Sequence, residues 1–212
     1  MKTAFITGCD SRTEWQLPWF IKNFRKHMPA EELIVYDFGL KGNRLAGVDY
    51  VTLDSLQPGW FKKPSAMLNA SIKYDAVCWL DTDCEVRDSI ADIWDSIPPG
   101  KIGLVEDMPW STRRGGTHYN TGVVAFRQTP PIITTWIQEI NLRSTLRGDQ
   151  EVLHEFLKSV PMNRLVHVHE LPNKYNALRL QIQDDTLPRE IRVMHWTGAY
   201  GNDEIMKQIR ES

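Results

Sequence analysis

Two carboxylates separated by one residue stand directly after an apolar run in the middle of the chain. Asp81 and Asp83 follow residues 76–80, which read Ala-Val-Cys-Trp-Leu. Carboxylate oxygens are hard ligands, so two that leave one strand end can hold a divalent cation, which in turn binds phosphate oxygens. Neither carboxylate is expected to face the core without a partner. The pattern predicts a metal and phosphate site. A plain turn is the other interpretation, since Asp and Thr are common turn residues.

The elements around this pair predict where it lies in the fold. A continuous apolar run such as 76–80 is typical of a strand buried on both faces of a mostly parallel sheet. Open α/β sheets bind their ligands outside the carboxyl ends of the strands. Earlier in the chain, apolar runs at 3–7 and 33–36 flank a helical spacing over 14–27. That order of strand, helix and strand implies a right-handed parallel crossover.

The same patterns extend along the rest of the chain. Further strands are expected at 48–53, 102–105, 123–126, 165–171 and 191–194, and further helices at 65–73, 87–97, 130–142 and 151–158. Asp149 is the expected N-cap of the last helix. Residues 106–119 contain proline and glycine and are expected to form a mobile surface loop. The sequence therefore predicts an α/β fold with a mostly parallel central sheet flanked by helices.

Length and composition limit the class of protein. The chain has 212 residues without a linker or charge block, so we expect one domain over residues 1–212. Its formal net charge of -2, with both signs interspersed, favours neither nucleic acid nor an anionic membrane as a partner. The three cysteines are an odd number and are expected to be reduced core thiols. No apolar stretch suits a signal peptide or a membrane span, so we expect a cytoplasmic protein.

Four short motifs occur in a fixed order along the chain. They are Trp-Leu-Asp-Thr-Asp at 79–83, Asn-Thr-Gly-Val at 120–123, Asp-Gln at 149–150 and His-Trp-Thr-Gly at 195–198. The ordered set resembles the GT-A glycosyltransferases, in particular the family-8 type that includes glycogenin and bacterial lipopolysaccharide galactosyltransferases. The resemblance covers nearly the whole chain. It implies a single GT-A (Rossmann-like) domain that moves a sugar from a UDP-sugar, UDP-glucose or UDP-galactose above all, to a hydroxyl of a glycan or another acceptor, with retention of configuration.

Such a transfer needs positive charge beside the leaving group. A nucleoside diphosphate departs, and the charge that develops on its phosphates has to be stabilised in place. We expect Asp81, Asp83 and His195 to hold Mn²⁺ or Mg²⁺, which acts as a Lewis acid. Imidazole as third ligand suits Mn²⁺ better than Mg²⁺. His167 and His169 alternate to one face and form a weaker competing metal pair.

The resemblance also implies contacts with the donor. Asp149 is the carboxylate expected near the reacting sugar, with a simple N-cap as the other interpretation. Lys63 is expected to contact the diphosphate, unless it is a solvated lysine. The other expected donor contacts are Thr7, Cys9, Asp10, Arg12, Asp37, Thr82, Asn120, Thr121, Gly122, Gln150 and Gly198. Within this set, Asp37 has a second interpretation as a turn residue.

The chain departs from the family pattern in two places. After His-x-x-Gly the family usually continues with Lys-Pro-Trp, whose lysine contacts the diphosphate, whereas residues 199–203 here read Ala-Tyr-Gly-Asn-Asp. Lys207 lies too far along to be assigned that role. The chain is also short for the family, a form that small viral and bacterial members share, and a viral member would act in the host cytoplasm.

Two other functions are compatible with the motifs. A sugar-nucleotide-binding module without turnover would explain the altered segment after Gly198. Haloacid-dehalogenase-like phosphatases also place Asp-x-Asp after a buried strand. They resemble this chain less, because their motif normally lies in the first strand and continues to Thr or Val, where Cys84 stands here.

Overall fold

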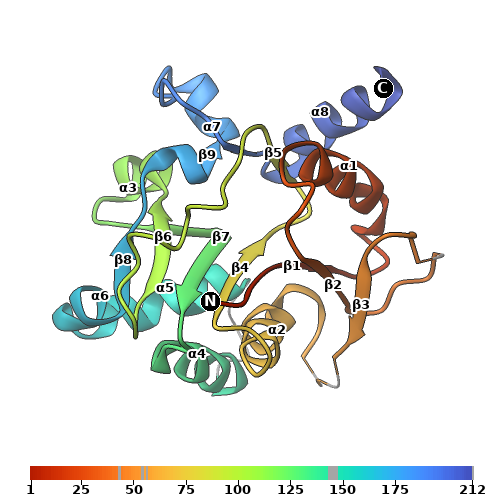
Figure 1. Ribbon diagram of the computed structural model, residues 1–212. Helices are drawn as coiled ribbons and strands as arrows, with labels where there is room; N and C mark the ends of the chain where they lie inside the picture. The colour runs from red at the N-terminus through yellow and green to blue at the C-terminus, as the bar shows by residue number, and fades with distance from the viewer. Residues whose placement is uncertain (43, 54, 56, 143–147, 212) are drawn as a thin grey trace.

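A seven-stranded sheet with the order β3-β2-β1-β4-β7-β6-β8 runs through the centre of the computed structural model (Figure 1). The structure describes residues 1–42, 44–53, 55, 57–142 and 148–211. The strands are β1 (Thr3–Cys9), β2 (Leu33–Asp37), β3 (Asp49–Thr52), β4 (Ala76–Leu80), β6 (Ile102–Glu106), β7 (Tyr119–Arg127) and β8 (Val168–Glu170). All neighbours pair in parallel except β7, which is antiparallel to β4 and β6. The expected mostly parallel sheet is confirmed.

A second, smaller sheet packs beside the carboxyl end of β4. It contains β5 (Cys84–Val86), β10 (Val193–His195) and β9 (Ala177–Leu178) in the order β5-β10-β9. β5 follows the Asp-x-Asp segment directly, and β10 pairs with it antiparallel so that His195 lies opposite Cys84. This pairing brings the end of the chain back to the end of the central strand.

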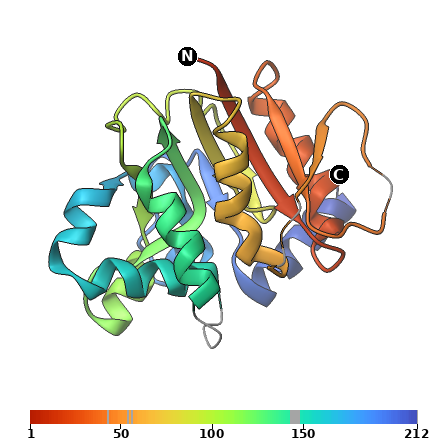
Figure 2. The ribbon, with the colours of Figure 1, turned by 90° about the horizontal axis from the view of Figure 1, so that it is seen from below.

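Helices cover both faces of the large sheet. They are α1 (Leu17–His27), α2 (Lys63–Ala70), α3 (Met108–Arg114), α4 (Pro131–Leu142), α5 (Asp149–Ser159), α6 (Pro161–His167), α7 (Arg179–Gln183) and α8 (Gly198–Glu211), with short 3₁₀ helices at Glu14–Gln16, Gly59–Lys62 and Asn173–Tyr175. One apolar core contains side chains of α1 and α8, and the other contains side chains of α2, α4 and α5. Figure 2 shows α2 and α4 side by side on one face. Among the described residues, none of these helices is both long and apolar enough to cross a membrane.

The helix expected at 87–97 is absent from the structure. The segment forms consecutive turns, in which the amides of Ile93 and Ile97 donate to carbonyls three residues earlier. Ile90, Ile93 and Trp94 are nevertheless buried in the core. Their helical spacing correctly indicates a buried face, but a series of turns can bury the same positions without forming a helix.

The expected loop at 106–119 contains α3 instead. Asp107 is its N-cap, because the Asp107 carboxylate accepts a hydrogen bond from the amide of Trp110 at 3.1 Å. Pro109 lies in the first turn, where a missing N–H costs nothing. Gly115 and Gly116, with φ of 71° and 83°, end the helix. Proline and glycine here mark the two ends of a helix, so the prediction of an irregular loop was wrong.

Two further expectations need correction. The strand expected at 165–171 is α6 up to His167 followed by the short β8, because the apolar alternation of 165–168 straddles the boundary between the two elements. Residues 120–122 lie inside β7 rather than before it. α8 was not expected from the sequence at all.

Candidate functional site

Asp83 and His195 meet where the two sheets adjoin. His195 Nε2 lies 3.0 Å from Asp83 Oδ1 and 4.0 Å from Asp81 Oδ2. The antiparallel register of β5 and β10 causes this contact, since it sets His195 opposite Cys84, the residue after Asp83. Of the three side chains expected to hold a cation, Asp83 and His195 thus meet and Asp81 lies beside them, whereas the described ligand atoms that lie within 4.8 Å of one another are those of Asp83, Cys84 and His195.

The other ring nitrogen of His195 is fixed by two amides. Nδ1 lies 3.0 Å from Asn120 Oδ1 and 3.1 Å from Asn176 Oδ1, both of which are acceptors, so Nδ1 carries a proton. In the neutral imidazole the lone pair is then on Nε2, which faces Asp81 and Asp83. Burial disfavours the charged imidazole, but the carboxylates of Asp83 and Asp81 together outweigh burial and raise the pKa of His195.

The donor atoms at this point fit a hard cation. Asp81 and Asp83 offer carboxylate oxygens and His195 an imidazole nitrogen, a set suited to Mn²⁺ or Mg²⁺. Cys84 also lies within ligand distance of Asp83 and His195. Burial raises the pKa of its thiol far above the usual range, and the thiol lies 3.6 Å from the carbonyl oxygen of Gly122, to which it donates. Burial thus favours the protonated thiol in the metal-free chain, whereas a bound cation would favour the thiolate, so Cys84 is a further candidate ligand.

Gly122 makes room for the imidazole. A Cβ at this position would lie 2.0 Å from His195 Cε1, a distance that real Cβ atoms do not adopt. Only glycine permits β7 to pass this close to β10.

Lys63 lies between two carboxylates at the start of α2. Its ammonium is 3.0 Å from Asp81 Oδ1, 3.0 Å from Asp149 Oδ2 and 3.0 Å from the carbonyl oxygen of Thr121. The side chain is 2% exposed, so it is not a solvated lysine. Burial disfavours its charge, yet the two carboxylates keep the pKa of Lys63 above its usual value. An ammonium has three N–H donors, and all three have partners within the protein.

Asp149 is the first residue of α5 and is not its N-cap. Gly148 occupies the N-cap position, while the Asp149 carboxylate is buried and accepts a hydrogen bond from Thr121 Oγ1 at 3.0 Å. Burial raises the pKa of Asp149, and the charge of Lys63 opposes the rise only in part. Gln150 Oε1 accepts from the amide of Thr121 at 3.1 Å. The Asp-Gln pair is thus joined to the middle of β7.

A cavity of about 400 Å³ lies between the end of β1, the 3₁₀ helix at Gly59–Lys62 and the start of α8. Asp10 and Arg12 form an ion pair of 2.7 Å on its wall, and the guanidinium lies 4.9 Å from the ring centroid of Trp60. The expected residues that line this cavity are Cys9, Asp10, Arg12, Lys63, Asp81, Thr82, Asp83, Asp149 and Gly198. Its charged lining is mainly carboxylate, because Arg12 and Lys63 are both paired with aspartates, so an anionic ligand would fit here only together with a cation.

Thr7 and Asp37 do not belong to the described residues that line this cavity. Thr7 is fully buried in β1. Asp37 accepts hydrogen bonds from the amides of Gly39 at 2.9 Å and Leu40 at 2.8 Å, which is the turn role that was its second interpretation. The structure thus separates both side chains from the rest of the expected donor set.

A second cavity of about 290 Å³ adjoins the first. The two share Lys63, Asp81 and Asp149 in their walls. Asn120, Thr121, Gln150 and His195 line only the second one. Except for Thr7, Asp37 and Gly122, which line neither space among the described residues, the expected site residues are therefore divided between two adjoining spaces around the ammonium of Lys63.

Several residues at the site were missed in the sequence. Asp107 lines the second cavity, is 2% exposed, and burial raises its pKa. The pattern Asp-Met-Pro, an N-cap followed by an early proline, could have identified it. Gln16 accepts a hydrogen bond from Thr82 Oγ1 at 2.6 Å and donates to Asn202 Oδ1 at 2.9 Å, which ties the Asp-x-Asp segment to α8. No local signal marks Gln16, Asn176 or Asn202, because their partners are remote in sequence.

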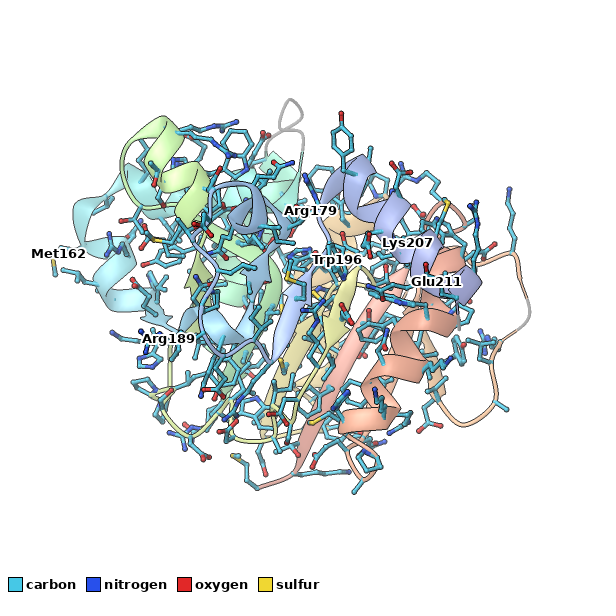
Figure 3. The ribbon with its side chains drawn as sticks, turned by 90° about the horizontal axis from the view of Figure 1, so that it is seen from above. Met162, Arg179, Arg189, Trp196, Lys207 and Glu211 are labelled. Atoms are coloured by element: carbon cyan, nitrogen blue, oxygen red, sulfur yellow. The ribbon has the colours of Figure 1, made fainter. Side chains whose placement is uncertain are left out.

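The segment after Gly198 forms α8 and offers no lysine to the cavity. Gly198 and Asn202 line the cavity wall. Lys207, labelled in the C-terminal part of α8 in Figure 3, is exposed and is not among the described residues that line either space. The lysine of the family pattern therefore has no counterpart from this helix.

Comparison with solved structures identifies the fold. No family model matches the sequence, and no curated protein is similar to it in sequence. The galactosyltransferase LgtC, solved with donor and acceptor sugar analogues, has a TM-score of 0.69 at 15% identity, with 98% of this chain and 95% of LgtC covered.

Two further structures agree with this comparison. A glycosyltransferase involved in glycosylation of the major capsid of PBCV-1 gives a TM-score of 0.65 at 13% identity, covering 97% of this chain and all (100%) of that one. The glycosyltransferase GlyE of Streptococcus pneumoniae TIGR4 gives a TM-score of 0.66 at 16% identity. The matched part covers 93% of this chain and 55% of GlyE. At these identities the similarity shows a shared fold, and the expected GT-A fold is confirmed.

Proposed function

We propose that this chain is a metal-dependent glycosyltransferase that moves a sugar from a UDP-sugar to a hydroxyl of an acceptor. The observation that carries the proposal is the contact of His195 Nε2 with Asp83 at 3.0 Å beside Asp81, next to the cavity that Asp10, Arg12 and Trp60 line. A hard cation site and a cavity for a nucleotide are what a nucleotide-sugar donor requires. The shared fold with solved glycosyltransferases supports it.

Asp81, Asp83 and His195 would hold the cation, which supplies Lewis acidity to the diphosphate when bound. In the transfer, the bond between the anomeric carbon and the diphosphate oxygen breaks, and a bond from that carbon to the acceptor oxygen forms. The acceptor hydroxyl loses its proton to the departing diphosphate. The nucleoside diphosphate leaves with the bonding electrons, so its negative charge must be stabilised.

Lys63 serves this reaction as a positioning residue. Its three N–H donors are directed to Asp81, Asp149 and Thr121, so no donor is left to bind a phosphate. It fixes the carboxylate of Asp81 for the cation and the carboxylate of Asp149 for the sugar. Asp149, with Gln150 beside it, is the group proposed to contact the donor sugar, because both line the second cavity.

We also propose that the configuration of the anomeric carbon is retained, and that UDP-glucose or UDP-galactose is the donor. Both clauses rest on the ordered motifs of family 8. The configuration of the product, read by proton NMR of the new glycosidic bond, tests the first clause. A product of inverted configuration would contradict retention alone and leave the metal-dependent transfer intact.

The reaction class is tested by hydrolysis of a panel of UDP- and GDP-sugars with Mn²⁺ or with chelator. We expect slow release of nucleoside diphosphate from one donor, lost with chelator and reduced at least about 100-fold in Asp83→Asn. Asp95→Asn, at an exposed acid of the 87–97 turns, is the matched control and should leave release unchanged.

The same assay separates the two other functions. Release of inorganic phosphate from phosphate monoesters, lost in Asp81→Asn, would favour a phosphatase. Binding of a UDP-sugar by calorimetry without release or transfer would favour a binding module. Release of nucleoside diphosphate from a sugar nucleotide contradicts both.

A further inference from the structure

A series of cavities leads from the Lys63 centre outward between α3 and α5. The cavity beside His195 shares Trp110 and Gln150 with an adjoining cavity of about 440 Å³. That cavity shares a further set of residues with a third one of about 400 Å³, namely Arg114, His118, Tyr119, His154 and Glu155. We call these last two cavities the outer groove. We call the first cavity, which Asp10, Arg12 and Trp60 line, the nucleotide cavity. Among the described residues, it shares no lining residue with the outer groove. A ligand in the groove would therefore approach Lys63 from the side away from the nucleotide.

Flat rings form much of the wall of the outer groove. Trp110 is 36% exposed, and the rings of His118 and His154 stack with centroids 4.0 Å apart and planes 10° from parallel. Burial and the neighbouring His118 lower the pKa of His154, so its ring stays neutral near neutral pH. Aromatic surfaces with a polar edge suit a ligand that is apolar on its faces and polar on its rim, as a sugar ring is.

The outer end of the groove is cationic. Arg114, Lys158 and Arg164 line the third cavity, against one carboxylate, Glu155. Arg164 lies 3.8 Å from Glu170, which offsets part of its charge. Arg114 lies over the Trp110 ring, 4.3 Å from the centroid. In the described part of the chain, neither Arg114 nor Lys158 has a carboxylate within ion-pairing distance. Within the described residues, Arg114 and Lys158 thus lie on the groove wall without a carboxylate at ion-pairing distance, while Glu151 and Glu155 line the same groove.

We propose that the outer groove binds the acceptor, and that this acceptor is a glycan with a negatively charged group on a sugar beyond the reacting one. The inference rests on the proposed function, which places the donor sugar in the cavity beside Lys63. Trp110 would stack on a sugar ring, while Arg114 and Lys158 would bind a carboxylate or a phosphate, the groups that a guanidinium matches best. The two outer cavities exceed the inner one in volume, so a single reacting sugar would leave most of the groove empty.

The test uses small probes and the indole signal of Trp110 in ¹⁵N NMR, assigned with Trp110→Phe. Glucuronate and glucose 6-phosphate carry the two anionic groups, methyl glucoside is the neutral probe, and inorganic phosphate is the anion without a sugar. We expect at least one anionic sugar to shift the Trp110 signal, with a Kd on the order of millimolar. The affinity for methyl glucoside should be at least about fivefold lower.

Charge-removing variants provide the second arm. The double variant Arg114→Gln, Lys158→Gln should bind the anionic sugars at least about fivefold more weakly and should bind methyl glucoside with unchanged affinity. Lys26→Gln, an exposed lysine of α1, is the control. A response to glucuronate alone or to glucose 6-phosphate alone supports the proposal and identifies the anionic group. Equal binding of methyl glucoside, equal binding of inorganic phosphate, or no response to any probe would overturn it.

Failure here is distinguishable from failure of the proposed function. The NMR titration needs neither donor nor cation. UDP-sugar hydrolysis, measured without acceptor on the unmodified chain and on Lys26→Gln, tests the donor chemistry independently of the groove. Hydrolysis without anionic binding refutes the groove alone, and binding without hydrolysis refutes the donor chemistry alone.

Discussion

Gly122 and His195 pack so closely that no side chain fits between them. A Cβ on Gly122 would lie 2.0 Å from His195 Cε1 and 2.3 Å from Nδ1. Any larger residue has to displace the imidazole or separate β7 from β10. The glycine therefore sets the position of the proposed third cation ligand without being a ligand itself.

Gly122→Ala is expected to weaken Mn²⁺ binding at least about tenfold, because a buried clash of this size cannot be relieved without moving His195. Titration of free Mn²⁺ by electron paramagnetic resonance measures the affinity. Gly42→Ala is the control, since a Cβ there would make only ordinary contacts with Glu14 at 3.8 Å. Unchanged Mn²⁺ affinity in Gly122→Ala would refute the role of His195 as a ligand.

Lys63→Met is expected to destabilise the fold by about 3–5 kcal/mol, because it leaves Asp81 and Asp149 facing each other without their buried cation. Urea unfolding at neutral pH measures the change in the free energy of unfolding. Lys22→Met, an exposed lysine of α1, should cost less than about 0.5 kcal/mol. A loss below about 1 kcal/mol in Lys63→Met would show that the carboxylates find other partners.

The stability contribution of Asp37 is expected to depend on pH. Burial opposes its charge, but hydrogen bonds from Leu40 and Gly39 and the nearby Arg44 lower its pKa in the folded chain. The stabilisation is therefore present above the ordinary Asp pKa of about 4 and is lost as pH falls through the lower folded value. Asp37→Asn keeps an acceptor oxygen and removes the charge, so it should lower the free energy of unfolding by about 1 kcal/mol at pH 7 and by less near pH 2.

Thermal unfolding of Asp37→Asn at the two pH values measures this difference. The same variant should leave the affinity for the donor unchanged, because Asp37 does not line the nucleotide cavity. Weaker donor binding in Asp37→Asn would restore its interpretation as a ribose contact.

Removal of the cation is expected to lower the thermal stability of the protein. A ligand that binds only the folded chain stabilises it by about 2.7 kcal/mol at 100 times its Kd. The melting temperature should therefore rise with Mn²⁺ and fall back with chelator, and His195→Gln should abolish the rise. His27→Gln, at a histidine of α1 far from the site in sequence, is the control. An equal rise in His195→Gln would show that His195 is not a ligand of the cation. His167 and His169 are not the next candidates, because His167 ends α6 and His169 lies in β8, so the strand alternation expected to pair them is absent.

The sequence was sufficient for the features that depend on neighbouring residues. The apolar run 76–80 predicted β4, and the carboxylates after it were correctly placed at the carboxyl end of a central strand. The order of strand, helix and strand at the start of the chain predicted the parallel pairing of β1 and β2. These signals are strong because strands of a parallel sheet are buried on both faces.

The features that no local pattern shows depend on remote partners or on the path of the backbone. Lys63 could not be told from a solvated lysine, because its burial comes from Asp149, which lies on another helix. The contact of His195 with Asp83 results from the pairing of β5 and β10, and three-residue strands have no periodic pattern. The spacing of Ile90, Ile93 and Trp94 correctly predicted that these side chains are buried, but it wrongly predicted a helix. Periodicity indicates which side of a segment is buried and does not indicate how its backbone turns.

Lys63, Asp81 and Asp149 form the only wall that the first and second cavities share in the described structure. The two compartments thus meet at these three charged residues. With a donor that spans both compartments, its sugar would face the outer groove, so water would reach the sugar by the same route as the acceptor. The rate at which water hydrolyses the donor would then report how far the groove is filled, and it would fall as acceptors or their unreactive analogues occupy the groove.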